Sequence, residues 1–387
     1  MKPFDFDELT IRRGTASLKW DTTDDPEVIP LWVADMDFRT APAVTLALAE
    51  RVASGIFGYV DIPQDYYRAL SSWFLRKHGW HINKDHVIPT TGVVPAVSAI
   101  IKAFTKPGDG VILQTPAYNC FFSSIRNNGC RLIDNPLLIK ELENGFSYDM
   151  DFVNLEVLAS DPRNKVLILC NPHNPTGRVW TREELTKVRD ICNANNVKVI
   201  SDEIHCELVH PGFEYTPFAY IDPTAVVCCS PSKAFNTAGL QIANIVASQP
   251  DDRYAINRAI NDNEVCDVNP FGVTGLIAAY DKGDGWLSSL KEYLEENRKF
   301  LHEIISENLP TWKICDSEST YLAWIDISAS GLEGDEMEEY LLKKAKVRIS
   351  SGSDYGDFRF IRINYACPRQ RLLTAMHRII EALKEML

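Results

Sequence analysis

Three short segments in the middle of the chain carry residues that could do chemistry together. They are residues 171–177 (NPHNPTG), 201–205 (SDEIH) and 230–233 (SPSK). An amine such as that of Lys233 can form an imine with an aldehyde. A carboxylate such as that of Asp202 can pair with a protonated pyridine nitrogen and keep that ring an electron acceptor. Taken singly, the three segments also fit a tight turn, a helix cap and a solvated turn, in that order.

Each of these segments directly follows a short apolar run. The runs 166–169, 197–200 and 225–229, with a further one at 111–113, are typical of strands buried on both faces. Between the first two lies Thr181-Arg182-Glu183-Glu184, a capping box with apolar residues at helical spacing after it. Strand, capped helix and strand make a βαβ unit, so we expect an α/β fold with a mainly parallel sheet. The three segments should then meet at the carboxyl edge of that sheet, where ligands bind.

The C-terminal third has a different pattern. A long amphipathic stretch over 286–308 precedes strand-like runs at 321–325 and 358–364, and a final helix is expected from about Pro368. These elements predict a smaller α+β domain. The first 45 or so residues show little periodicity and should lie over it. We therefore expect a large domain over 46–285 and a small domain made of 1–45 and 286–387.

Bulk composition excludes several classes of protein. The 387 residues carry a net charge of −13, which disfavours nucleic acid as a partner. No secretory signal or run of about 20 apolar residues is present, so no membrane span is expected. The ten cysteines form no CxxC pair, which suggests a cytoplasmic protein with free thiols. The eight histidines show no ligand spacing, so no metal is expected.

Nearly the whole chain resembles the fold-type I enzymes that use pyridoxal 5′-phosphate (PLP), the aspartate aminotransferase superfamily of class I/II. Within it, the chain is most similar to the cystathionine β-lyase-like MalY/PatB branch. The strings that carry the resemblance are residues 31–38 (LWVADMDF), 57–59 (FGY), 115–118 (TPAY), 170–177 (CNPHNPTG), 201–205 (SDEIH) and 233–240 (KAFNTAGL). The resemblance implies the PLP-dependent transferase fold, with a large PLP-binding domain and a smaller domain.

The resemblance also implies roles for individual residues. Lys233 would hold PLP as a Schiff base and move the proton at the substrate Cα, and Asp202 would pair with the pyridine nitrogen. Asn174 would meet the ring 3′-oxygen and the substrate carboxylate, and His205 stands where many relatives have a tyrosine. The other expected cofactor-binding residues stack on the ring or surround the phosphate: Tyr118, Gly92, Val93, Val94, Ser230 and Ser232.

Substrate binding and assembly follow from the same resemblance. Arg362 would grip the substrate α-carboxylate, although Arg359 on the same run is a competing candidate. Val33 would belong to the pocket wall. Tyr59 would reach the phosphate of a neighbouring subunit, which implies a homodimer with shared sites. One position departs from many aminotransferase relatives, because Gln241 stands where they carry a phosphate-binding arginine.

The expected function is therefore a PLP-dependent carbon–sulfur β-lyase that acts on L-cystathionine or related cysteine S-conjugates. An aminotransferase would need the same lysine, aspartate and arginine and is the alternative. A non-catalytic regulator on the same scaffold is disfavoured, since such proteins usually add a basic DNA-binding module. The sequence leaves open which amino acid is the physiological substrate.

Overall fold

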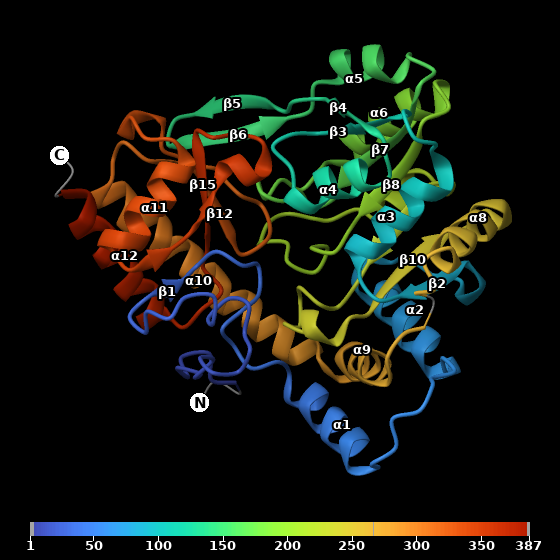
Figure 1. Ribbon diagram of the computed structural model, residues 1–387, viewed down its shortest axis with the longest axis horizontal. Coiled ribbons are helices and arrows are strands. Elements are labelled where there is room, and N and C mark those ends of the chain that lie inside the picture. The colour runs from blue at the N-terminus through green and yellow to red at the C-terminus, as the bar shows by residue number, and fades with distance from the viewer. Residues whose placement is uncertain (1–3, 266, 385–387) are drawn as a thin grey trace.

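A seven-stranded sheet forms the centre of the larger lobe (Figure 1). The structure, a computed structural model, describes residues 4–265 and 267–384. The strand order is β2 (Val87–Thr90), β10 (Ala243–Ala247), β9 (Val226–Cys229), β8 (Lys198–Asp202), β7 (Asn164–Cys170), β3 (Gly110–Leu113) and β4 (Arg131–Asp134). The five strands from β9 to β4 pair in parallel, and β10 is antiparallel to both β2 and β9. The mainly parallel sheet is confirmed; β2, β4 and β10 were not among the predicted strands.

Helices cover both faces of this sheet, which explains why its strands are apolar throughout. In β7, Val166 and Ile168 share a core with α3 (Val93–Phe104), α4 (Asn119–Asn127) and α8 (Pro250–Asn261). Leu167 and Leu169 point the other way, into a core with α5 (Phe152–Ala159), α6 (Arg182–Ala194) and α7 (Phe218–Ile221). Beside them, α9 (Pro270–Lys282) packs against α1 (Pro42–Ala53) and α2 (Gln64–His78).

The predicted capping box starts α6. The Thr181 hydroxyl accepts the Glu184 N–H at 3.2 Å, and the Glu184 carboxylate accepts the Thr181 N–H at 2.8 Å. Two backbone donors of the first turn are thus satisfied by side chains.

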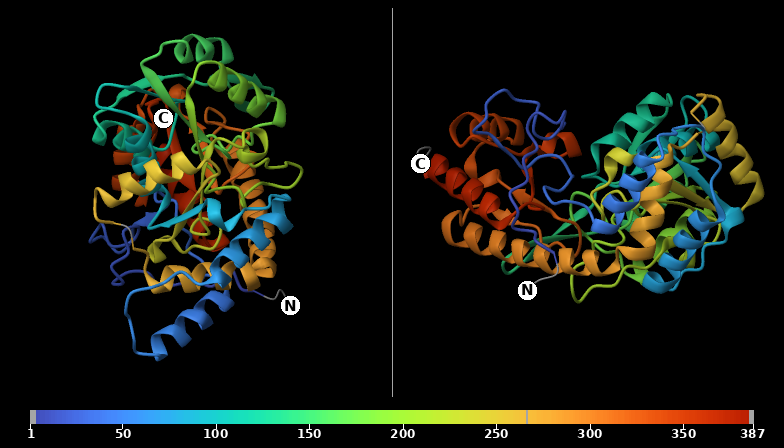
Figure 2. Two further views of the ribbon diagram at one scale, coloured as in Figure 1. Left: turned by 90° about the vertical axis from the view of Figure 1, so that its right-hand side faces the viewer. Right: turned by 90° about the horizontal axis from the view of Figure 1, so that it is seen from below.

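A four-stranded sheet forms the centre of the smaller lobe. Its order is β11 (Lys313–Ile314), β12 (Leu322–Asp326), β15 (Phe360–Asn364) and β14 (Ser350–Ser351), with α11 (Gly334–Lys344) and α12 (Arg369–Lys384) beside it. The long helix α10 (Asp284–Asn308) runs beneath both lobes (Figure 2, right). The hairpin of β5 (Leu138–Leu142) and β6 (Gly145–Asp149) reaches this lobe through a bridge between Phe146 and Cys315.

The N-terminal segment lies against the smaller lobe, as expected (Figures 1 and 2). Its only regular element before α1 among the described residues, β1 (Ile29–Pro30), pairs in parallel with β13 (Val347–Arg348). The exact domain boundaries given above stay a prediction.

Two whole-chain features bear on environment. Of the nine described cysteines, seven are buried, all are free, and Cys120 and Cys130 are partly exposed. Within residues 4–265 and 267–384 we find no helix with both the length and the apolar character that crossing a membrane requires.

Candidate active site

The three predicted segments meet at one edge of the large sheet. Strands β7 and β8 end at Cys170 and Asp202, which pair in register, and Lys233 follows shortly after the end of β9. Here they border a cavity of about 200 Å³. The predicted residues that line this cavity are Gly92, Val93, Val94, Tyr118, Asn174, Asp202, His205, Ser232 and Lys233.

Lys233 is the amine of this cavity. Its Nζ donates to the Ala34 carbonyl oxygen at 2.7 Å, and Tyr321 donates to the same oxygen at 3.1 Å. Burial and the nearby Arg362 cation lower the pKa of Lys233 to about 8, although the Asp35 and Asp202 carboxylates act against this. An amine with such a pKa is partly neutral near pH 7, as a nucleophile or general base must be.

Asp202 is buried, and burial raises the pKa of its carboxyl group to about 6. The Ile204 N–H, which donates to Oδ1 at 3.0 Å, and the Lys233 amine both favour the ionised form. A cation at this position would stabilise the carboxylate further, because opposite charges attract strongly away from water.

His205 lies beside Asp202 and is also buried. Burial, together with the Lys233 and Arg362 cations, lowers the pKa of its imidazole to about 3, so the ring is neutral. Its Nδ1 atom is buried and has no hydrogen-bond partner in the described part of the chain. Buried polar atoms are nearly always paired, so this atom suits a polar group of a ligand.

Arg362, on β15 of the smaller lobe, lies behind the cavity lining and contacts it through Asn174. Its guanidinium donates to Asn174 Oδ1 at 3.2 Å and to the Trp32 carbonyl at 2.9 Å, and it lies 4.5 Å from the Tyr355 ring centroid. Its Nε atom is buried and has no hydrogen-bond partner among residues 4–265 and 267–384. The competing candidate Arg359 is 46% exposed and pairs with Asp357. Of the two arginines, the structure brings only Arg362 to the site.

The N-terminus of α3 closes one end of the cavity. Gly92 is its N-cap and supplies no side-chain cap, so the N–H groups of the first turn lack a side-chain acceptor. Such a helix end attracts anions, phosphate above all. Tyr118, the N-cap residue of α4, lines another wall, and burial raises the pKa of its phenol well above 10, so the hydroxyl stays protonated.

The two predicted serines are placed differently. Ser232 lines the cavity, whereas the Ser230 hydroxyl donates to the Ile242 carbonyl at 2.6 Å and accepts the Ser232 N–H at 3.1 Å. The Ser230 hydroxyl proton is therefore already used in a hydrogen bond within the protein, and Ser230 stabilises the 230–233 loop. Gln241, with a φ of +51°, also lines the cavity.

Tyr59 and Val33 lie outside the lining of the cavity. Tyr59 is 97% exposed, so the described residues leave its side chain open to solvent. The Val33 carbonyl accepts from Asn364 at 2.6 Å. Sequence reasoning missed Asn364, although it lies two residues after Arg362 and therefore on the same face of β15.

Arg178 ties the loop that carries Asn174 to the smaller lobe. Its Nη1 lies 2.6 Å from Glu318 and its Nη2 lies 2.9 Å from Glu184. The preceding Gly177 has a φ of +73°, and a Cβ atom there would meet the Ser317 Cβ at 2.5 Å. Only glycine lets the loop approach so closely.

One group of residues outside the cavity combines donor atoms that metals bind. His78, Cys206 and Glu207 bring such atoms within 4.8 Å of one another. Glu207 already accepts from Trp73 Nε1 at 2.6 Å and pairs with His78 Nε2 at 2.9 Å. Hydrogen bonding accounts for this arrangement.

Comparisons with known proteins agree with the fold and the cavity. The family model for aminotransferase class I and II matches residues 26–379. Cystathionine β-lyase PatB of Bacillus subtilis (strain 168) is 40% identical over 388 residues, which cover 98% of this chain and 99% of that protein.

Two solved structures are similar along nearly their whole length. Cystalysin from Treponema denticola, which contains a PLP cofactor, superposes with a TM-score of 0.95 at 34% identity, covering 99% of this chain and 100% of that one. The PLP-bound C–S lyase from Staphylococcus hominis gives 0.91 at 32% identity, covering 98% of each chain. On the family match and these identities, the chain belongs to the aminotransferase class I and II family, in the branch that includes PatB.

Proposed function

We propose that this protein is a PLP-dependent carbon–sulfur β-lyase that cleaves L-cystathionine or a related cysteine S-conjugate to a thiol, pyruvate and ammonia. The observation that carries the proposal is one cavity lined by Lys233 and Asp202, with Arg362 hydrogen-bonded to the lining residue Asn174. The likeness to PatB, a cystathionine β-lyase, supports the choice of reaction.

The residues of the cavity fit PLP part by part. The Lys233 amine suits its aldehyde and the Asp202 carboxylate suits its ring nitrogen. The start of α3 offers N–H groups to its phosphate. The unpartnered Nδ1 of His205 and the amide of Asn174 offer polar contacts to the rest of the ring.

When bound, PLP supplies an electron sink for the bonds at the substrate Cα. Asp202 holds the proton on the ring nitrogen, because a buried carboxylate is most stable beside a cation. Lys233 takes the proton from the substrate Cα, a task that its lowered pKa suits. The carbon–sulfur bond then breaks, the sulfur leaves with the electron pair, and the protonated Lys233 can return a proton to it. Water then hydrolyses the remaining three-carbon fragment to pyruvate and ammonia.

Arg362 binds the α-carboxylate of the substrate. Its planar fork matches a carboxylate, and its buried Nε still has a free donor. The Asn174 amide, 3.2 Å from the guanidinium, orients it. The substrate carboxylate would thus be held on the side of the cavity that faces the smaller lobe.

The active enzyme is a homodimer in this proposal. Several apolar side chains are exposed on α1 and the loop after it, which lie at the edge of the molecule (Figure 1): Leu46, Val52, Ile56, Phe57 and Tyr59. Exposed apolar surface of this kind marks a protein contact, and a second copy of the chain is the partner we propose. Tyr59 would then reach the phosphate bound in the other subunit.

A cytoplasmic location belongs to the same proposal. The nine described cysteines are all free, as is usual where thiols are kept reduced.

The test combines an absorption spectrum with a product assay. The purified protein should show the visible band of bound PLP and should release pyruvate from L-cystathionine. Lys233→Ala should abolish pyruvate release, and equal activity in that variant would contradict the proposal. Conversion of the cofactor to its pyridoxamine form without pyruvate would instead identify an aminotransferase.

A further inference from the structure

Residues 32–35 form a segment whose backbone carbonyl oxygens face the functional side chains. The Trp32 carbonyl accepts from Arg362 at 2.9 Å, and the Ala34 carbonyl accepts from Lys233 at 2.7 Å. The proposed carboxylate-binding residue and the proposed base are thus both hydrogen-bonded to one short segment, which bends at residues 33–35. Any shift of this segment moves both of them.

The other two carbonyl groups of the segment are also fixed. Asn364 donates to the Val33 and Asp35 carbonyl oxygens, at 2.6 Å each. The Asp35 carbonyl also accepts from Lys19 at 3.2 Å, and Trp32 Nε1 in turn donates to the Lys19 carbonyl at 3.2 Å. Lys19 is therefore tied to both ends of the segment.

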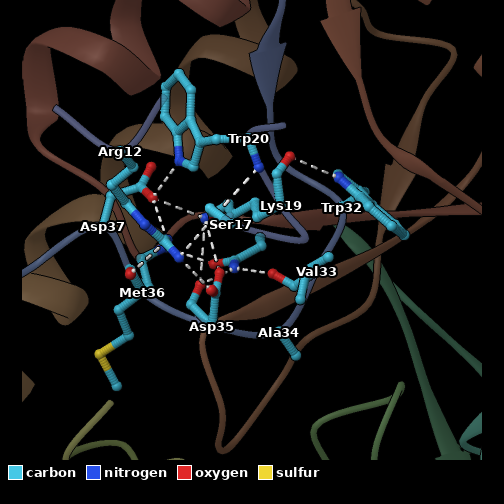
Figure 3. A network of polar contacts seen from close by, with 12 residues as sticks. Arg12, Ser17, Lys19, Trp20, Trp32, Val33, Ala34, Asp35, Met36 and Asp37 are labelled. Atoms are coloured by element: carbon cyan, nitrogen blue, oxygen red, sulfur yellow. Dashed lines mark hydrogen bonds and ion pairs between the residues drawn. The ribbon is translucent and has the colours of Figure 1, made fainter. Parts of the chain in front are cut away.

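The Lys19 side chain has no exposed surface. Its Nζ lies 3.5 Å from Asp35 Oδ1 and 3.3 Å from Asp37 Oδ1 (Figure 3). Lysine is rarely buried completely unless it is paired, since its ammonium group is strongly hydrated in water. Here the two carboxylates and one carbonyl group replace that water.

Asp37 has other cationic partners besides Lys19. Arg12 lies 2.9 Å from Oδ1 and Arg371 lies 2.9 Å from Oδ2, and the Trp20 indole also donates to Oδ1 at 2.9 Å. Burial would raise the pKa of Asp37, but these neighbours and Lys19 together hold it below its usual value. Without Lys19, Asp37 would still be paired with Arg12 and Arg371. The Asp35 carbonyl oxygen and Asp35 Oδ1 would lose the ammonium group that they contact.

We propose that Lys19 is a positioning residue of the active site. Its buried ammonium group fixes Asp35, and through it the Ala34 and Trp32 carbonyl groups that hold Lys233 and Arg362. Lys19 touches neither substrate nor cofactor. The kinetic part of this inference rests on the proposed function, but its spectroscopic part needs only bound PLP.

Lys19→Met removes the charge and keeps the volume of the side chain. We expect kcat/KM for pyruvate release to fall about 10- to 100-fold, because a misplacement of about 1 Å can cost that much. The pH midpoint of the visible PLP band should also rise, by roughly half a unit, because the Asp35 carboxylate, which raises the pKa of Lys233, loses a cationic partner. Lys19→Met deletes none of the groups that act on the pKa of Lys233 directly, which are Arg362, Asp35, Asp202 and Cys120.

Lys346→Met is the matched control. Lys346 pairs with Asp25 at 2.8 Å and so ties the same N-terminal segment to the smaller lobe, but it does not contact residues 32–35. This variant should lower the melting temperature without moving the band midpoint or kcat/KM. A merely structural role for Lys19 predicts the same result for Lys19→Met, and that outcome would overturn the proposal.

A further variant covers the case in which Lys19→Met does not fold. Arg12, whose side chain is 23% exposed, lies 2.7 Å from Asp35 Oδ2. Arg12→Gln should shift the band midpoint in the same direction by a smaller amount, and a wild-type midpoint would refute the inference. If the wild-type protein binds PLP but releases no pyruvate, the proposed function fails while the band midpoints still test Lys19.

Discussion

Lys233 and Asp202 are groups of opposite charge that the fold takes out of water, and burial moves the pKa of each toward neutrality. The Lys233 amine has a pKa of about 8 and the Asp202 carboxyl group a pKa of about 6. Each is therefore poised near the pH at which the proposed reaction would run. Both values follow mainly from desolvation, so a bound cofactor that brings its own charge will change them.

The raised pKa of Asp202 predicts how the cofactor-free protein responds to pH. A carboxyl group with a folded pKa of about 6 and an unfolded value of 3.8 favours folding below pH 3.8, and this contribution is lost as the pH rises through 6. Asp202→Asn should therefore stabilise the cofactor-free protein by roughly 3 kcal/mol at about pH 8 and by less at about pH 5. Urea unfolding of both proteins at the two pH values measures this. An equal stabilisation by Asp202→Asn at both pH values would contradict this prediction.

Arg362 and Arg359 offer a matched pair for the substrate carboxylate. Lysine keeps the charge of Arg362 but loses its planar fork, so Arg362→Lys should raise KM for L-cystathionine about 10- to 100-fold. Arg359 pairs with Asp357 at the surface, so Arg359→Lys should leave KM unchanged. Steady-state kinetics of the two variants tests this role. Similar KM values would contradict the proposal that Arg362 binds the substrate carboxylate.

At the level of elements, the sequence pattern predicted the helices and strands whose signals lie within a few consecutive residues. The apolar runs that became β3, β7, β8 and β9 and the capping box of α6 were recognisable because burial on both faces and capping leave direct traces in sequence. Strand β10 was missed, because Asn244 interrupts its apolar run (ANIVA), so the continuous apolar pattern that marked the other strands is absent.

The residues of the candidate site also fall into those that local pattern predicted and those that it did not. Asn174, Asp202 and Lys233 follow successive parallel strands, so their order in sequence predicts that they meet. Arg362 comes from the other lobe, and only the family resemblance pointed to it. The burial of Lys19 could not be predicted, because it depends on carboxylates at 35 and 37 and on the fold of the whole N-terminal segment.

The capping box of α6 gives a prediction that concerns stability alone. Thr181→Ala removes the acceptor for the Glu184 N–H and should lower the free energy of unfolding by about 1 kcal/mol. The control Thr186→Ala lies on the same helix, where its hydroxyl donates to the Arg182 carbonyl at 2.7 Å and caps nothing. It should change stability by less than about 0.5 kcal/mol. Denaturant unfolding distinguishes the two, and equal losses would contradict the capping role.

On the scale of the whole molecule, each of the two lobes supplies part of the candidate site. The large lobe supplies the lysine, the aspartate and the helix end, and the smaller lobe supplies Arg362. The N-terminal segment links them, since residues 32–35 contact both Lys233 and Arg362. The site is therefore assembled only when the two lobes and this segment are in place together.

The proposed dimer predicts the size of the particle in solution. The chain has a mass of 43.7 kDa, so sedimentation should give about twice that value. Phe57→Glu places a charge among the exposed apolar residues and should shift the protein toward monomers and weaken PLP binding. Val153→Glu is the control, because Val153 is 78% exposed on α5. A monomeric wild-type protein would rule out the shared site.

The buried cysteines have a consequence for an enzyme whose proposed product is a thiol. Burial raises the pKa of all seven buried thiol groups: Cys170, Cys192, Cys206, Cys228, Cys229, Cys315 and Cys367. Disulfide exchange proceeds through the thiolate, and a protonated, inaccessible sulfur offers almost none. Product thiols that oxidise in solution can therefore form mixed disulfides at Cys120 or Cys130, but not at the six buried cysteines away from the cavity. Cys170 lines the cavity, and there its raised pKa is what opposes the exchange.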